Sequence, residues 1–261
     1  MSASEDETAS QPEVSLEDQG MSIIDHLIEL RDRLLKGLLA VAIVFGCLFP
    51  FSDVIYSTIA TPLLAHMPEG TSMIAIDVAS PFLVPFKLTL MVSIVVAVPV
   101  LLYQAWQFVA PGLYKHEKSL VAPLLISSVL LFYLGMAFAY YVVLPLVFNF
   151  LLNVAPSGIA VATDIGRYLD FITTLFFAFG IAFEVPIATI LLVITGATTP
   201  EQLAAKRAYV IVAVFVIGML LTPPDVISQT LLAIPMWLLY EIGILCSKLL
   251  VRKQHAKTIA S

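Results

Sequence analysis

The sequence predicts an all-α polytopic membrane protein with six transmembrane helices, and three observations lead to this fold class. Of the 261 residues, 60% are hydrophobic and 12% are charged, whereas about 25% of the residues in a soluble domain are charged. The apolar residues gather in six stretches of 14 to 31 residues, and a spanning helix needs about 20. The two cysteines, Cys47 and Cys246, lie inside two of these stretches, which excludes a disulfide-stabilised secreted domain.

The chain begins with a polar, acidic segment at residues 1–20, which we expect to be a disordered tail because it has few apolar residues. It lacks the apolar region of a secretory signal peptide. We expect residues 21–250 to form one membrane domain and residues 251–261 a basic tail. The domain opens with Ile23, Leu27, Leu30 and Leu34 at helical spacing, opposite charged side chains. This pattern predicts an amphipathic helix that lies at the membrane surface and leads into the bilayer.

The six predicted spans cover residues 34–51, 85–109, 120–150, 169–195, 208–221 and 226–246. The fifth has 14 residues, which rise about 21 Å against a hydrocarbon core of about 30 Å. A linker containing Pro223 and Pro224 joins it to the sixth, so we expect a tight antiparallel hairpin of two short spans. Residues 52–84 combine prolines with apolar residues and are expected to be an outer loop that packs as a cap over the span ends.

Basic residues predict the orientation of these spans. Eleven of the thirteen Lys and Arg residues lie in the N-terminal segment, the loops after the second and fourth spans, and the C-terminal tail. Lys87 and Arg167 lie on the opposite side. Because basic loops stay in the cytoplasm, both termini are predicted to be cytoplasmic. The net charge of −6 comes mainly from the first 32 residues, and the chain has no basic patch suited to nucleic acid.

The sequence contains few features of an enzyme. It has no phosphate-binding glycine loop and no hydrolase nucleophile motif. The four histidines, His26, His66, His116 and His255, are scattered over both predicted membrane faces, so we do not expect a shared metal site. We therefore expect neither enzymatic activity nor a cofactor.

One carboxylate falls deep within a predicted span. Glu184 lies about 15 residues into the fourth span, where a charge costs about 2.5–3.5 kcal/mol and calls for a partner. Pro186 should kink the helix beside it. Two interpretations remain open: Glu184 serves transport, or it is a protonated side chain hydrogen-bonded inside the helix bundle.

Further carboxylates lie at the predicted cytoplasmic face. Glu29 and Glu117 each have a simple explanation, as ion-pair partners of Arg33 and Lys118. Acting together, two carboxylates on one face could instead bind a basic ligand, and an arginine guanidinium pairs with carboxylates in a bidentate geometry. Near other span ends, Glu241 and Lys87 are expected to extend toward the lipid headgroups.

Five segments resemble the TatC family, the multispanning subunit of the twin-arginine protein translocase. They are HLIELRDRL at 26–34, DVASPF at 77–82, WQFVAPGLYKHE at 106–117, FGIAFEVP at 179–186 and MLLTPPDVISQTLLAIPM at 219–236. The resemblance extends from about residue 22 to 247. It implies a glove-like bundle in the bacterial inner membrane that binds twin-arginine signal peptides at the cytoplasmic face. It also implies assembly with the single-span subunits TatA and TatB and with other TatC copies, and export of folded proteins driven by the proton-motive force.

The resemblance also implies which residues act. Glu29 and Glu117 would form the twin-arginine site, with Arg31 and Phe108 beside them. Roles in transport or in contacts with partner subunits are implied for Glu184, Pro62, Asp225 and Gln229. A proton-coupled secondary transporter, with Glu184 carrying the proton, is the alternative interpretation of the sequence.

Overall fold

The computed structural model describes residues 16–64, 75–76, 78–109, 121–147, 164–221 and 226–260. All the regular elements in these ranges are helices, which confirms the all-α fold class. In chain order they are α1 (Leu16–Leu48), η1 (Phe49–Phe51), α2 (Ser52–Leu64), α3 (Ser80–Val109), α4 (Val121–Phe138), η4 (Ala139–Val143), α6 (Ile165–Ala182), α7 (Val185–Ile194), α8 (Pro200–Ala205), α9 (Arg207–Leu221) and α10 (Val226–Ala260).

Helix length and composition mark the chain as a multi-pass membrane protein. Five helical segments in the described ranges are long and apolar enough to cross a bilayer: Ile24–Ile59, Ser80–Phe108, Val121–Val147, Ile165–Ile194 and Leu232–Arg252. A further apolar helix, Arg207–Leu220, is shorter than these five. Its length agrees with the short fifth span expected from the sequence, and the total of six crossings stays a prediction.

Three boundaries differ from the expectation. Helix α1 is continuous from Leu16 to Leu48, so the last residues of the expected tail, the amphipathic segment and the first span form one helix. The expected outer loop at 52–84 contains α2 and the first turn of α3, so its first part is helical and continues from η1. Helix α10 has 35 residues and continues into the expected basic tail, so the sixth span is not a short helix.

The predicted kink in the fourth span is present. Helix α6 ends at Ala182, and α7 begins at Val185 after a turn formed by Phe183 and Glu184. Pro186 lies in the first turn of α7, where its missing N–H costs no helical hydrogen bond. The carboxylate of Glu184 therefore lies in the break between α6 and α7.

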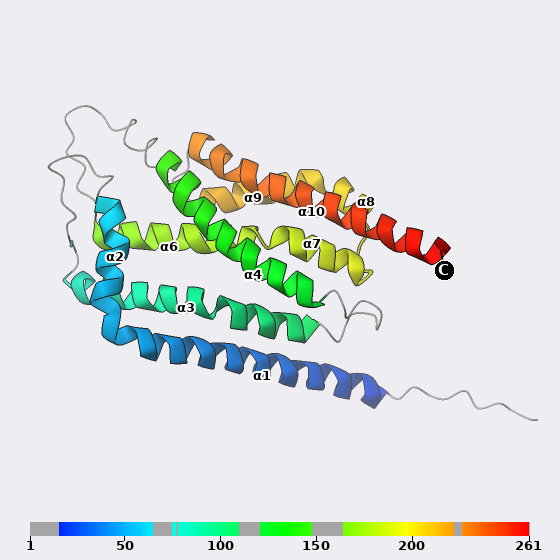
Figure 1. Ribbon diagram of the computed structural model, residues 1–261, viewed down its shortest axis with the longest axis horizontal. Coiled ribbons are helices and arrows are strands. Elements are labelled where there is room, and N and C mark those ends of the chain that lie inside the picture. The colour runs from blue at the N-terminus through cyan, green and yellow to red at the C-terminus, as the bar shows by residue number, and fades with distance from the viewer. Residues whose placement is uncertain are drawn as a thin grey trace, which may run out of the picture.

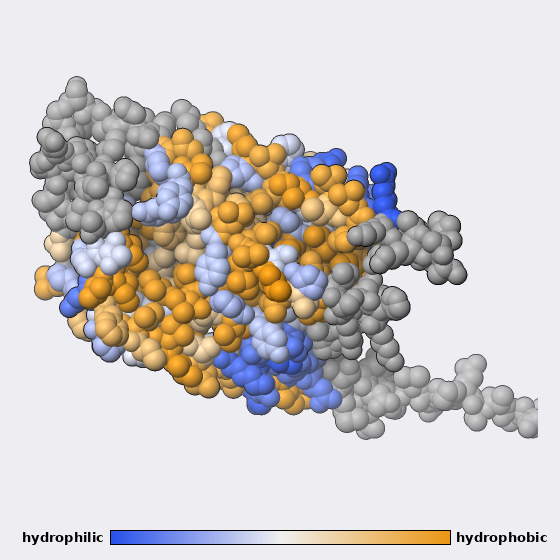
Figure 2. Space-filling view, viewed as in Figure 1, coloured by the Kyte–Doolittle hydropathy of each residue, from blue (hydrophilic) through white to orange (hydrophobic). Residues whose placement is uncertain are grey.

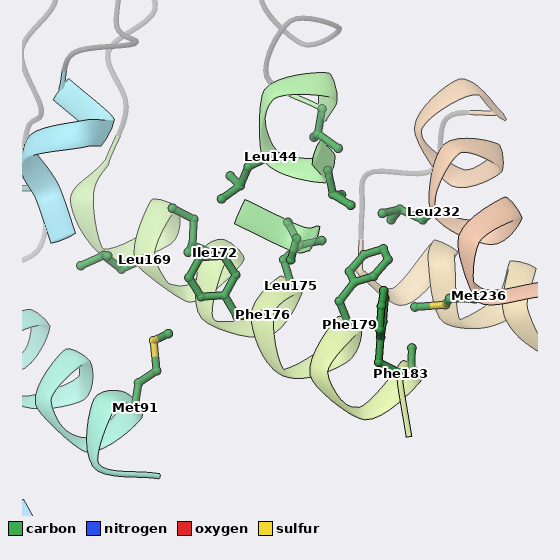
Figure 3. Close-up of a cluster of buried hydrophobic side chains, with 14 of the residues drawn as sticks. Met91, Leu144, Leu169, Ile172, Leu175, Phe176, Phe179, Phe183, Leu232 and Met236 are labelled. Atoms are coloured by element: carbon green, nitrogen blue, oxygen red, sulfur yellow. The ribbon is translucent and has the colours of Figure 1, made fainter. Parts of the chain in front are cut away.

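Helix α6 carries the centre of the apolar core. Leu175 and Phe179 are almost completely buried and pack with side chains from α3, α4, η4, α9 and α10 (Figure 3). Helix α4 approaches α6 closely at Gly135, where an added Cβ would lie 2.5 Å from the carbonyl oxygen of Phe179. This close approach fixes the face of α4 that is turned toward α6 and α7.

The helices lie side by side, so the molecule has two distinct ends (Figure 1). The start of α1, the end of α3, the start of α4, the end of α7 and the end of α10 share one end. In a view of one face, strongly hydrophilic residues gather toward this end and flank a mainly hydrophobic surface (Figure 2). The structure thus separates a polar end from apolar sides suited to lipid.

Candidate functional site

An aromatic stack joins the first half of α1 to the end of α3. The His26 imidazole lies on the Phe108 ring, with ring centroids 4.3 Å apart and an angle of 24° between the planes. Farther along, Gly37 lets α1 approach α3, because an added Cβ would lie 2.9 Å from Leu101 Cδ2. His26 and Glu29 are three residues apart and share one side of α1. The stack therefore holds the turn that carries Glu29 beside the end of α3.

Glu29 makes the intrahelical ion pair that its spacing predicts. Arg33 Nη2 donates to Glu29 Oε1 at 3.0 Å, and both side chains are partly buried. Arg31 pairs instead with the adjacent Asp32, with Nη2 2.8 Å from Oδ1, and its side chain is exposed. Such exposed or half-exposed pairs contribute at most about 1 kcal/mol, so a ligand guanidinium could replace Arg33 at small cost.

Part of the predicted site lies outside the described residues. Glu117 falls in segment 110–120 and Asp225 in segment 222–225, and neither segment is described. Pro62 belongs to the last turn of α2. The pairing of Glu29 with Glu117 therefore stays a prediction, supported by Phe108 lying at the point where α3 leads into the segment that holds Glu117.

Glu184 takes part in a hydrogen-bonded chain across three helical segments. Ser128 Oγ on α4 donates to Glu184 Oε2 at 2.6 Å. Trp106 Nε1 on α3 donates to Ser128 Oγ at 3.4 Å, a long hydrogen bond. The second carboxyl oxygen, Oε1, is buried without a hydrogen-bond partner in the described part of the chain. The expectation of a hydrogen-bonded buried glutamate is thus met at one oxygen and not at the other.

Gln229 holds the last hairpin together. Its Nε2 donates to the carbonyl oxygen of Phe215 at 2.6 Å, which joins α10 to α9. Gly218 makes room for this contact, because an added Cβ would lie 3.2 Å from Gln229 Cγ. Below it, the two helices border a small apolar groove of about 230 Å³. Its lining residues are Ile211, Val214, Phe215, Ala233, Ile234 and Trp237.

Two charged residues expected to extend to the headgroups, Glu241 and Lys87, each form an ion pair with a residue of another helix. Arg207 at the start of α9 forms a bidentate pair with Glu241 of α10, with Nη2 2.7 Å from Oε2. Lys87 of α3 pairs with Asp170 of α6 at 3.1 Å. The only sequence signal for either pair is the presence of opposite charges at span ends on the same predicted membrane face.

Asp164 is a further residue that sequence reasoning missed. It caps α6 by accepting a hydrogen bond from the backbone N–H of Arg167 at 2.9 Å, and it accepts a second from Ile76 N–H at 3.1 Å. These two backbone donors hold the pKa of the Asp164 carboxyl below its usual range, and the Arg167 N–H has the larger effect. The side chain thus ties the segment before α3 to the start of α6. The available sequence signal was an aspartate directly before an apolar helical stretch, because aspartate is a preferred N-cap residue.

Comparisons with known proteins agree on one family. The family model described as Sec-independent protein translocase protein (TatC) matches residues 25–235. The TatC protein of Azotobacter chroococcum mcd 1 is 60% identical over 227 residues, which cover 87% of this chain and 89% of the relative. That of Escherichia coli (strain K12) is 58% identical over 240 residues, 92% of this chain and 93% of the relative. A crystal structure of a twin arginine translocase receptor, TatC, matches with a TM-score of 0.77 at 44% identity, covering 86% of this chain and 98% of the other.

Proposed function

Because the chain belongs to the TatC family of Sec-independent protein translocase proteins, we propose that it is the receptor subunit of a twin-arginine translocase. Like its relatives, which are protein translocase components, it takes part in protein transport and is not an enzyme. In this proposal it lies in the bacterial inner membrane with six spans and both termini in the cytoplasm. There it binds twin-arginine signal peptides, assembles with TatA, TatB and further TatC copies, and uses the proton-motive force to export folded proteins.

The observation that carries the proposal is the stack of His26 on Phe108. It holds the Glu29 turn against the end of α3, and Glu117 follows Phe108 by nine residues in the sequence. When a peptide with two adjacent arginines binds, Glu29 would give up its weak contact with Arg33. It would form a bidentate pair with one guanidinium of the peptide instead. Glu117 would take the second guanidinium, and Arg31 and Phe108 would border the bound peptide.

The remaining predicted residues are assigned to transport and partner contacts. Glu184 lies at the break between α6 and α7, and Gln229 sits at the α9–α10 hairpin, which also includes Asp225. Pro62 belongs to the segment after the first span. The alternative of a proton-coupled small-molecule transporter is not favoured, because the similar proteins are protein translocase components.

Peptide binding to the purified full-length chain in lipid nanodiscs tests the recognition site. A labelled signal peptide with Arg-Arg is compared with one carrying Lys-Lys. Charge-assisted bonds contribute about 1.5–3 kcal/mol, so Glu29→Gln and Glu117→Gln should each weaken Arg-Arg binding by about tenfold or more. Their combination should abolish the preference over Lys-Lys.

Asp32→Asn is the matched control, since Asp32 is an exposed carboxylate in the same helix that pairs with Arg31. It should leave the arginine preference intact. Tight and arginine-selective binding by the Glu29→Gln, Glu117→Gln double variant would refute the proposed site.

A further inference from the structure

The carboxyl of Glu184 is oriented by a neighbour on another helix and not by its own. Glu184 occupies the N-cap position of α7, yet its side chain makes no capping hydrogen bond there. Its backbone lies in the αR region and not in the extended region of a capping residue, and Pro186 offers no N–H in the first turn. Here Oε2 accepts a hydrogen bond from Ser128 of α4 at 2.6 Å. The hydrogen bond from Ser128 is thus the contact that orients this carboxyl in the described part of the chain.

Ser128 differs in its bonding from other buried hydroxyl residues of the described chain. Thr89, Ser93 and Ser247 donate to the carbonyl of the residue four positions earlier in their own helices, as hydroxyls in membrane helices commonly do. Ser128 is equally buried, with 1% of its surface exposed, but it donates to a side chain on a different helix. Its hydroxyl proton thus links elements and leaves the α4 backbone alone.

Trp106 sets the direction of this hydrogen bond. An indole N–H can only donate, and a serine hydroxyl has a single proton. Because Trp106 Nε1 points its proton at Ser128 Oγ, the Ser128 proton is left to point at Glu184 Oε2. Trp106 is itself buried in the α3 face turned to the bundle. The two donors therefore act in series along a path from α3 through α4 to the α6–α7 break.

Close packing of α4 against α6 keeps the hydrogen-bonded residues Trp106, Ser128 and Glu184 aligned. Ser128, Phe132 and Gly135 are the buried residues of α4 and recur at helical spacing. Gly135 sits against the carbonyl of Phe179, and the Phe132 ring sits against Gly180, so α4 cannot slide along α6. Ser128 is thereby held next to the turn that follows α6, where Glu184 lies.

We propose that Ser128 and Trp106 are positioning residues for Glu184, and that they hold Oε2 so that Oε1 is the one carboxyl oxygen left for a further donor. This inference rests on the proposed transport role of Glu184. Oε1 is buried and unpartnered in the described chain, and a buried acceptor gains stability when a donor reaches it. The position of that oxygen is set by two side chains outside the helix that carries it.

Transport and spectroscopy together test the proposal, with the full translocase in membrane vesicles. Ser128→Ala removes one oxygen atom, and Trp106→Phe removes the indole N–H while keeping an aromatic ring. Each should slow export of a twin-arginine cargo by about three- to tenfold, the loss expected for one hydrogen bond to a carboxyl. Ser128→Thr keeps the hydroxyl and should restore most of the rate. Ser93→Ala, which removes a buried hydroxyl bonded within its own helix, should leave the rate unchanged.

Infrared spectroscopy of the purified chain separates geometry from transport. The Glu184 carboxyl band is the one that disappears in Glu184→Ala. It should shift in Ser128→Ala, return in Ser128→Thr and stay in place in Ser93→Ala. An unshifted band in Ser128→Ala, or full export by that variant with the band shifted, would overturn the proposal. Full export by Glu184→Ala would instead overturn the transport role of Glu184, and the band shift would still decide whether Ser128 orients the carboxyl.

Discussion

Asp164 shows how one half-buried side chain can join two distant segments. Its two carboxyl oxygens accept from Arg167 N–H, at the start of α6, and from Ile76 N–H, 88 residues earlier in the sequence. Both donors favour the charged carboxylate, which is why the pKa of Asp164 lies below its usual range. Folding and ionisation of this residue are therefore linked.

The lowered pKa predicts a loss of stability in acid. In the unfolded chain the carboxyl titrates near its ordinary pKa of about 3.9. The contribution of Asp164 is thus fully present above that pH and is lost as the pH falls through the lower pKa of the folded state. The thermal unfolding midpoint of the wild-type chain should exceed that of Asp164→Ala by a constant amount above about pH 4, and the difference should shrink below it.

Asp164→Asn is the control for this experiment, because asparagine caps helices well without titrating in this range. The gap between Asp164→Asn and Asp164→Ala should stay constant with pH. A difference between wild type and Asp164→Ala that grows on acidification would contradict the assigned linkage.

Single residues were predictable where the partner is near in sequence. The Glu29–Arg33 pair follows from helical spacing alone, and the structure has it. The partners of Glu184, Glu241 and Lys87 come from other helices, and no spacing rule specifies which faces of separate helices meet. The cost of a carboxylate at membrane depth correctly indicated that Glu184 needs a partner, but not that the partner is Ser128.

Helices α4 and α6 depend on small residues for their close contact. At Gly135 a side chain would meet backbone, namely the carbonyl of Phe179 at 2.5 Å, which cannot move aside as a flexible side chain can. Gly46 of α1, by contrast, has no atom within 4 Å of an added Cβ. The two glycines are thus equivalent in secondary structure and opposite in packing.

Gly135→Ala should destabilise the bundle by about 1–3 kcal/mol, the usual cost of overpacking. Gly46→Ala should be neutral or stabilise by up to about 1 kcal/mol, because alanine favours the helix. Thermal unfolding of the two purified variants in the same detergent measures both effects. Equal midpoints for the two variants would show that the α4–α6 approach is not as close as the structure has it.

Helix boundaries were predictable to the extent that proline and charge mark them. The break before α7 follows from Pro186, and the short α9 follows from the prolines after it. The sequence pattern does not reveal the continuity of α1 and of α10, because the polarity of the residues changes within both helices. A helix continues across such a change when its backbone hydrogen bonds are satisfied internally, and neither Gly37 in α1 nor Pro235 in α10 ends its helix.

The distribution of charge over the bundle carries a prediction about orientation. Lys206 and Arg207 lie where α8 meets α9, and Lys248 and Arg252 lie in the second half of α10, whose end is at the same end of the molecule as the start of α1 (Figure 1). With Cys47 and Cys246 replaced, a cysteine at Ser157 should react with a membrane-impermeant maleimide added outside intact cells. A cysteine at Glu201, exposed on α8, should react only after the membrane is opened. The reverse pattern would contradict cytoplasmic termini.

The overall architecture was therefore more predictable than its interior contacts. Composition and hydrophobic length indicate an α-helical membrane protein without any knowledge of packing. Which helix lies against which depends on steric fits such as Gly37 with Leu101 and Gly180 with Phe132. These fits involve residues far apart in the chain, so no local pattern reports them.

The continuity of α1 has a mechanical consequence. Its 33 residues make a rod about 50 Å long, longer than a bilayer with its headgroups, which measures about 40–45 Å. No proline interrupts it, and the ring contacts of His26 with Phe108 and of Phe45 with Phe86 hold it against α3 on both sides of Gly37. We expect a displacement of the turn that carries Glu29 to move the other end of α1, and with it η1 and α2. Binding of a ligand at Glu29 is thus expected to be transmitted along α1 without any change in the helix itself.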